Sequence, residues 1–70
     1  MWWNIQQIDD GQFEIWADGG PRIFAKNRQE LDQQTGPNGI TGELYQNVLR
    51  QLAATGKARI KVRLGQFFQI

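Results

Sequence analysis

The 70-residue chain contains no cysteine, no histidine and no serine. Without cysteine there can be no disulfide bond and no thiolate metal site. Without histidine and serine, the common nucleophile–base pairs are excluded, as is a zinc site with histidine or cysteine ligands. Carboxylates such as Glu14 and Asp18 remain, but the sequence offers no second group to pair with either of them. We therefore expect no catalytic residue, no metal site and no cofactor.

Long apolar stretches are missing as well. No run approaches the roughly 18–20 residues that cross a bilayer, and the start MWWNIQQIDD lacks the features of a secretory signal. We expect a soluble, cytoplasmic protein without a membrane partner. The composition, 40% hydrophobic and 21% charged, is typical of a folded chain, and residues 1–70 suit a single domain. A core of this size is marginal, which favours stabilisation by a partner.

The first 26 residues have the pattern of three short strands. Residues 2–8, 13–17 and 22–26 are rich in aromatic and β-branched side chains, which suit an extended, half-buried segment. Residues 9–12 (DDGQ) and 18–21 (DGGP) separate them and are typical of tight turns, because glycine accepts a positive φ without a steric clash. The sequence therefore predicts an antiparallel three-stranded meander.

The middle of the chain has two helix signals. Asn27 followed by Glu30 fits a capping box at the start of a short helix. Thr41 can cap a longer helix over residues 42–54, which Gly56 would terminate. One stripe of this longer helix is apolar: Leu44, Tyr45, Val48, Leu49 and Leu52. The spacing makes Tyr45 a packing residue rather than a catalytic one.

Residues 57–64 (KARIKVRL) alternate between charged and apolar side chains without interruption, which predicts a strand. The predicted order of elements is thus β-β-β-(short α)-α-β. We expect an α+β fold in which a small antiparallel sheet, formed by the N-terminal meander and the C-terminal strand, packs against one main helix.

The predicted last strand has one cationic face, made of Lys57, Arg59, Lys61 and Arg63. The charge is uneven along the chain, since residues 1–20 hold four acids and no base and residues 57–70 hold four bases and no acid. The bases can pair with Glu14 and Asp18 on a neighbouring strand, contact a nucleic-acid backbone, or contact an acidic protein. Trp16 lies on the same face by parity and can stack under an arginine.

Two aromatic pairs, Trp2-Trp3 and Phe67-Phe68, lie at opposite ends of the chain. In a strand, one member of each pair faces the core and the other faces away. Burial of the outward ring would contribute about 1.5–3 kcal/mol. The outward rings therefore belong to a docking surface, or the two termini lie side by side and cover each other.

We predict a small non-catalytic protein-binding module: an accessory subunit, assembly factor or regulator that docks on a larger protein. A homodimer through an exposed edge strand is a variant of this hypothesis. The alternative is a nucleic-acid-binding protein that uses the basic strand, although a net charge of +1 counts against it. The predicted contact residues are Trp2, Trp3, Trp16, Lys57, Arg59, Lys61, Arg63, Phe67 and Phe68.

Overall fold

The computed structural model describes residues 1–62, so the predicted contact residues Arg63, Phe67 and Phe68 lie outside the described residues. The strands form one antiparallel sheet in the order β3-β2-β1-β4. This confirms the predicted α+β class and the order β-β-β-α-α-β. The elements are β1 (Trp2–Asp9), β2 (Gln12–Ala17), β3 (Ile23–Ala25), α1 (Arg28–Thr35), a 3-10 turn (Gly36–Asn38), α2 (Gly42–Thr55) and β4 (Lys57–Lys61).

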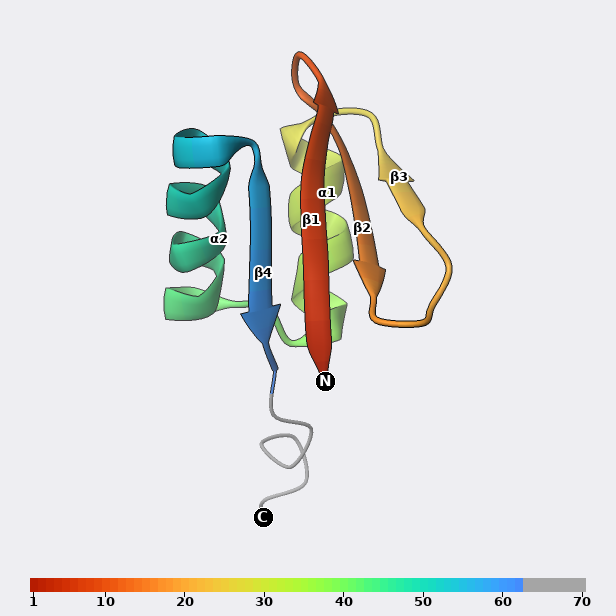
Figure 1. Ribbon diagram of the computed structural model, residues 1–70, viewed down its shortest axis with the longest axis vertical. Coiled ribbons are helices and arrows are strands. Elements are labelled where there is room, and N and C mark those ends of the chain that lie inside the picture. Colours follow the sequence, from red (N-terminus) through yellow and green to blue (C-terminus); the bar gives the residue numbers. More distant parts are fainter. Residues whose placement is uncertain (63–70) are drawn as a thin grey trace.

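Both helices lie on the same side of the sheet, which gives the molecule two layers (Figure 1). The longer helix, α2, contacts β4 and β1, whereas α1 contacts β2 and β3. The short helix is thus part of the covering layer, and its Leu31 is fully buried. Within residues 1–62, no helix or strand covers the opposite face of the sheet.

Alternation along the strands places the core between the two layers. Ile5 pairs with Ile15 on one side and with Ala58 on the other, so these three side chains point to the same face. Every strand and both helices contribute to the core, whose buried apolar residues are Trp3, Ile5, Phe13, Ile15, Ala25, Leu31, Ile40, Val48, Leu52, Ala58, Ile60 and Val62. The alternation predicted for the last strand is therefore confirmed over its described part.

The two predicted turns join β1 to β2 and β2 to β3. Gly11 and Gly19 adopt φ values of 72° and 79°, in the left-handed region that glycine enters without a Cβ clash. The backbone N–H of Gly20 donates to the carbonyl of Ala17 at 2.8 Å and closes the second turn. Since a one-residue slip would turn every apolar side chain outwards, these turns help to fix which face of the sheet is buried.

Tyr45 joins the two helices. Its ring packs against the core, its hydroxyl donates to Asp32, and the hydroxyl oxygen accepts a hydrogen bond from Nε of Arg28 at 3.0 Å. Arg28 and Asp32 also form an ion pair within α1, with Nε and Oδ1 3.6 Å apart. Tyr45 thus has the packing role predicted from its spacing.

The two helices start differently although both have a polar residue at the N-cap. Asn27 accepts a hydrogen bond from the backbone N–H of Glu30 at 2.8 Å, and Glu30 accepts one in return from the N–H of Lys26 at 3.0 Å. Thr41 occupies the N-cap position of α2, but its side chain makes no capping hydrogen bond. The capping box is therefore formed at α1, where the reciprocal bond goes to Lys26.

This difference gives a matched pair of substitutions. We expect Asn27→Ala to lower the free energy of unfolding by about 1 kcal/mol, because it leaves an N–H of the first turn of α1 without its side-chain acceptor. Thr41→Ala changes a residue at the same helical position but removes no capping bond, so we expect a smaller loss. Urea unfolding followed by tryptophan fluorescence measures both, and equal losses would contradict the assignment of the cap.

Candidate functional site

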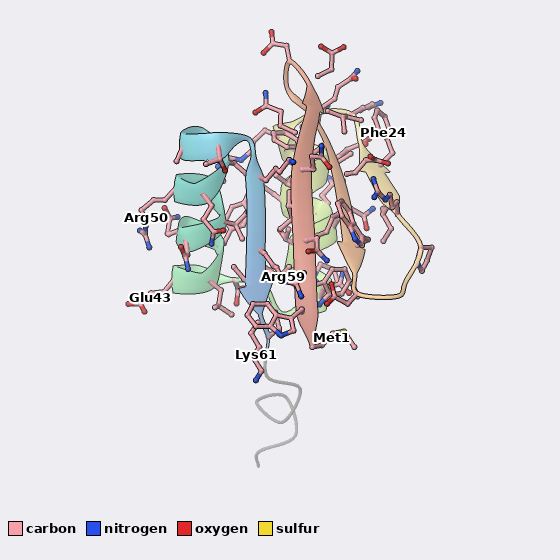
Figure 2. The ribbon with its side chains drawn as sticks, in the orientation of Figure 1. Met1, Phe24, Glu43, Arg50, Arg59 and Lys61 are labelled. Atoms are coloured by element: carbon pink, nitrogen blue, oxygen red, sulfur yellow. The ribbon has the colours of Figure 1, made fainter. Side chains whose placement is uncertain are left out.

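The face of the sheet turned away from the helices is the candidate site, and we call it the open face. Residues that pair across neighbouring strands share a face, so the register assigns its members. They are Trp2, Asn4, Gln6, Glu14, Trp16, Phe24, Lys57, Arg59 and Lys61, with Asp18 and Arg22 at the margin. Figure 2 shows Phe24 beside β3, at the opposite side of the sheet from β4, which carries Arg59 and Lys61.

One polar network crosses β1 on the open face. Arg59 Nη2 lies 2.7 Å from Oδ2 of Asp18, and Nδ2 of Asn4 donates to Oδ1 of Asp18 at 2.7 Å. Arg59 Nη1 also donates to Oδ1 of Asn4 at 3.3 Å. The predicted pairing between the basic strand and Asp18 is therefore present, but β4 neighbours β1 rather than β2. Arg59 reaches Asp18 because its side chain is long enough to span the intervening strand.

Both tryptophans of the open face have a guanidinium over their rings. The Arg59 guanidinium lies 4.8 Å from the ring centroid of Trp2, and that of Arg22 lies 4.1 Å from the ring centroid of Trp16. Arg22 Nη1 is also 3.3 Å from Oε1 of Glu14. The predicted stacking of an arginine on Trp16 is thus confirmed, and the arginine comes from the segment before β3 instead of from the basic strand.

The Trp2-Trp3 pair divides between the two faces, as parity predicted. Trp3 is a core residue, whereas Trp2 is 41% exposed on the open face. The end of the chain at Met1 is held by β4, since the main-chain groups of Met1 and Val62 exchange two hydrogen bonds of 2.8 and 3.0 Å. The first strand is therefore paired up to its first residue.

The two lysines of the open face have no carboxylate partner among residues 1–62. The acids of this face are already engaged, Asp18 by Arg59 and Glu14 by Arg22. Neither Lys57 nor Lys61 forms an ion pair with any residue in the described part of the chain. The open face therefore has an excess of positive charge at β4.

The outer edge of β4 is occupied by side chains of α2. Gln51 Oε1 accepts from the backbone N–H of Arg59 at 3.0 Å, and Nε2 of Gln51 donates to the carbonyl of Arg59 at 3.4 Å. The Thr55 hydroxyl accepts from the N–H of Lys57 at 3.3 Å and donates to the carbonyl of Lys57 at 3.0 Å. These two side chains occupy the main-chain groups of Lys57 and Arg59 that would otherwise bond to a further strand.

Sequence reasoning missed this role of Gln51 and Thr55. Their spacing of four residues places them on one side of α2. Glutamine and threonine are common on exposed helices, so the sequence does not distinguish these two from other surface residues. Their contact with the edge of β4 follows only from the position of α2 beside that strand (Figure 1).

The described part of the chain has neither a cluster of metal-ligating side chains nor a membrane-spanning helix. It contains no group of three or more aspartate, glutamate, histidine or cysteine side chains placed to hold a metal ion. Among these residues no helix has both the length and the apolar character of a membrane span.

Comparisons of the chain with models of protein families, with curated proteins and with solved structures find no match.

Proposed function

We propose that this chain is a small non-catalytic protein-binding module whose open face docks on an acidic surface of a larger protein. The observation that carries the proposal is a sheet face that no helix or strand of residues 1–62 covers. On this face Trp2 is 41% exposed and pairs with Lys61 of β4, whereas Phe24 is 52% exposed on β3, at the other side of the sheet. Neither Lys57 nor Lys61 has an ion-pair partner among the described residues. Aromatic residues and arginine are enriched at protein interfaces, where the rings fill pockets and the guanidinium groups make several hydrogen bonds.

The charge of the open face favours an acidic partner. Its own carboxylates are taken up by arginines, which leaves Lys57 and Lys61 to interact with groups outside the described chain. Lysines at the margin of a docking surface raise the association rate with an oppositely charged partner more than they raise the final affinity. The excess positive charge is thus expected to guide binding, and the aromatic rings to hold the complex.

The arrangement of the indole rings favours a protein over a nucleic acid. Single-stranded nucleic acids bind proteins largely by stacking their bases on free aromatic rings. On the open face the rings of Trp2 and Trp16 already have arginine guanidinium groups over them. The two unpaired lysines, with a net charge of +1 for the chain, form a small electrostatic site for a phosphate backbone. Nucleic-acid binding through the basic strand is the alternative function, and the experiment below distinguishes it from protein binding.

The proposal is tested by capture with a matched pair of charge variants. Lys61→Glu changes the open face, and Arg50→Glu makes the same change on an exposed position of α2, away from it (Figure 2). Each full-length protein is immobilised and exposed to extract of its native cell, with and without nuclease treatment, and bound proteins are quantified by mass spectrometry. We expect wild type and Arg50→Glu to retain one protein that Lys61→Glu and Trp2→Ala lose.

Two further measurements decide between the outcomes. The captured protein is purified and titrated against each variant, and its affinity should fall as the salt concentration rises because the lysines are exposed. Gln46→Ala, which shortens an exposed side chain of α2, should leave binding unchanged. Equal capture by all variants, or capture that disappears once nucleic acid is digested, would overturn the proposal, and the second result would favour the nucleic-acid alternative.

A further inference from the structure

The outer edge of β3 differs from the outer edge of β4. The N–H of Asp18 donates to the carbonyl of Trp2, so the even-numbered residues of β2 bond to β1 and the odd-numbered ones to β3. In β3, Ile23 and Ala25 pair with those odd-numbered residues, and Phe24 lies between them. The backbone N–H and C=O of Phe24 consequently point away from the sheet.

Besides Phe24, one neighbouring residue at this edge has main-chain groups without a partner among the described residues. Arg22, two residues before Phe24, has no main-chain hydrogen bond within residues 1–62. At the other end the N–H of Lys26 is taken up by Glu30. The described structure thus has one sheet edge, at β4, filled by Gln51 and Thr55, and one edge, at β3, with main-chain groups available to a strand.

The charges around β3 decide what kind of strand it can accept. Phe24 is 52% exposed, and the flanking Arg22 and Lys26 side chains are 55% and 66% exposed. In an antiparallel pair of two copies centred on Phe24, Arg22 of one copy would lie opposite Lys26 of the other. Like charges at facing positions are destabilising, so a second copy is disfavoured at this edge. Arg22 lies 3.3 Å from Glu14 and Lys26 lies 3.7 Å from Glu30, but both pairs are exposed and such pairs contribute little to stability. Carboxylates of an added strand can therefore bind the same two cations, which favours a strand that carries acids.

We propose that β3 binds an extended acidic peptide segment, which adds to the sheet as a further antiparallel strand. The segment has an apolar residue opposite Phe24 and a carboxylate two positions away on each side, opposite Arg22 and Lys26. Main-chain hydrogen bonds to Phe24 provide the pairing, and the alternate side chains provide the specificity. This inference rests on the proposed function, since it identifies the segment of the acidic partner that the module recognises.

The test uses a synthetic peptide with the central sequence Glu-Thr-Ile-Thr-Glu, titrated into the full-length isotopically labelled protein by NMR. We expect the backbone amide signal of Phe24 to move and its hydrogen exchange to slow. Replacing both glutamates of the peptide by lysine should weaken binding by about tenfold. Methylating the peptide nitrogens that face β3 should abolish it, because those nitrogens lose their hydrogens while the protein stays unchanged.

Two variants of the protein test the main-chain hydrogen bonds between Phe24 and the peptide by changing Phe24 instead of the peptide. Phe24→Ala removes the ring and keeps the N–H, whereas Phe24→Pro removes both. Proline is tolerated on an edge strand whose N–H faces solvent, so no bond within the sheet is lost. We expect Phe24→Pro to bind the peptide at least about tenfold more weakly than Phe24→Ala. The comparison is made after circular dichroism shows that both variants are folded.

The outcomes separate this inference from the proposed function. Binding that is insensitive to methylation of the peptide, or shifts confined to Trp2, Trp16 and β4, would overturn strand addition and leave docking through the open face intact. The absence of any binding at millimolar peptide would also overturn strand addition. The proposed function fails independently, when Lys61→Glu and Trp2→Ala capture the same partner as wild type.

Discussion

Replacing Leu31 with alanine is expected to lower the free energy of unfolding by about 2–5 kcal/mol. Leu31 is fully buried and is the one large aliphatic side chain that α1 supplies to the core. A chain of 70 residues has a total stability of about 4–10 kcal/mol. The cavity left by one leucine would thus remove a large part of it.

Urea unfolding with Trp3 as the buried fluorophore measures this loss. Leu49→Ala is the matched control, because Leu49 is a half-buried leucine in the middle of α2. We expect Leu49→Ala to lower the free energy of unfolding much less, since a partly exposed side chain loses less transfer energy and leaves no closed cavity. Equal losses in the two variants would show that α1 does not share in forming the core.

Gly56→Ala is expected to lower the free energy of unfolding by about 1–2 kcal/mol. Gly56 ends α2 with a φ of 77°, and the space around it is open, so the loss comes from the backbone conformation rather than from a steric clash. The residue cannot easily relax, because its N–H donates to Leu52 and its carbonyl accepts from Gln7, both at 2.8 Å. These two bonds fix the point where the chain passes from α2 to β4.

Gly56→Asn is the control for this prediction. Asparagine enters the left-handed region more readily than alanine does, so it replaces glycine there with less strain. We expect Gly56→Asn to lower the free energy of unfolding less than Gly56→Ala. Thermal unfolding by circular dichroism compares the two. Equal losses in both variants would indicate that Gly56 is needed for a reason other than its positive φ.

Local sequence was sufficient to predict the secondary structure. The turns at Gly11 and Gly19 and the helix end at Gly56 each require a positive φ, which only glycine readily adopts. The strand over residues 57–61 shows the regular alternation of a sheet with one buried face. These signals depend on neighbouring residues alone, and tertiary contacts reinforce them here.

Parity along the strands predicted part of the open face. It divided Trp2 and Trp3 between the two faces and placed Trp16 on the face of the bases of β4, because successive side chains of a strand alternate between faces. It did not predict that β1 would lie between β2 and β4. Asp18, which follows β2, was therefore expected on a strand next to the basic strand, whereas β1 separates the two. Nor did it predict Arg22 on Trp16, since parity associated Trp16 with the arginines of the basic strand, which shares its face.

The amino-acid sequence by itself determined which segments are strands and helices and which side of each strand is apolar, because those properties follow from alternation, helical spacing and glycine positions. Only the tertiary structure decided the order of the strands, and with it the contact of Arg59 with Asp18 across β1. It also decided that Gln51 and Thr55 occupy the β4 edge, while at the β3 edge no described residue bonds the main-chain groups of Phe24. The physical reason is that strand order and helix placement depend on how the apolar faces pack together, and many residues far apart in the chain contribute to that packing.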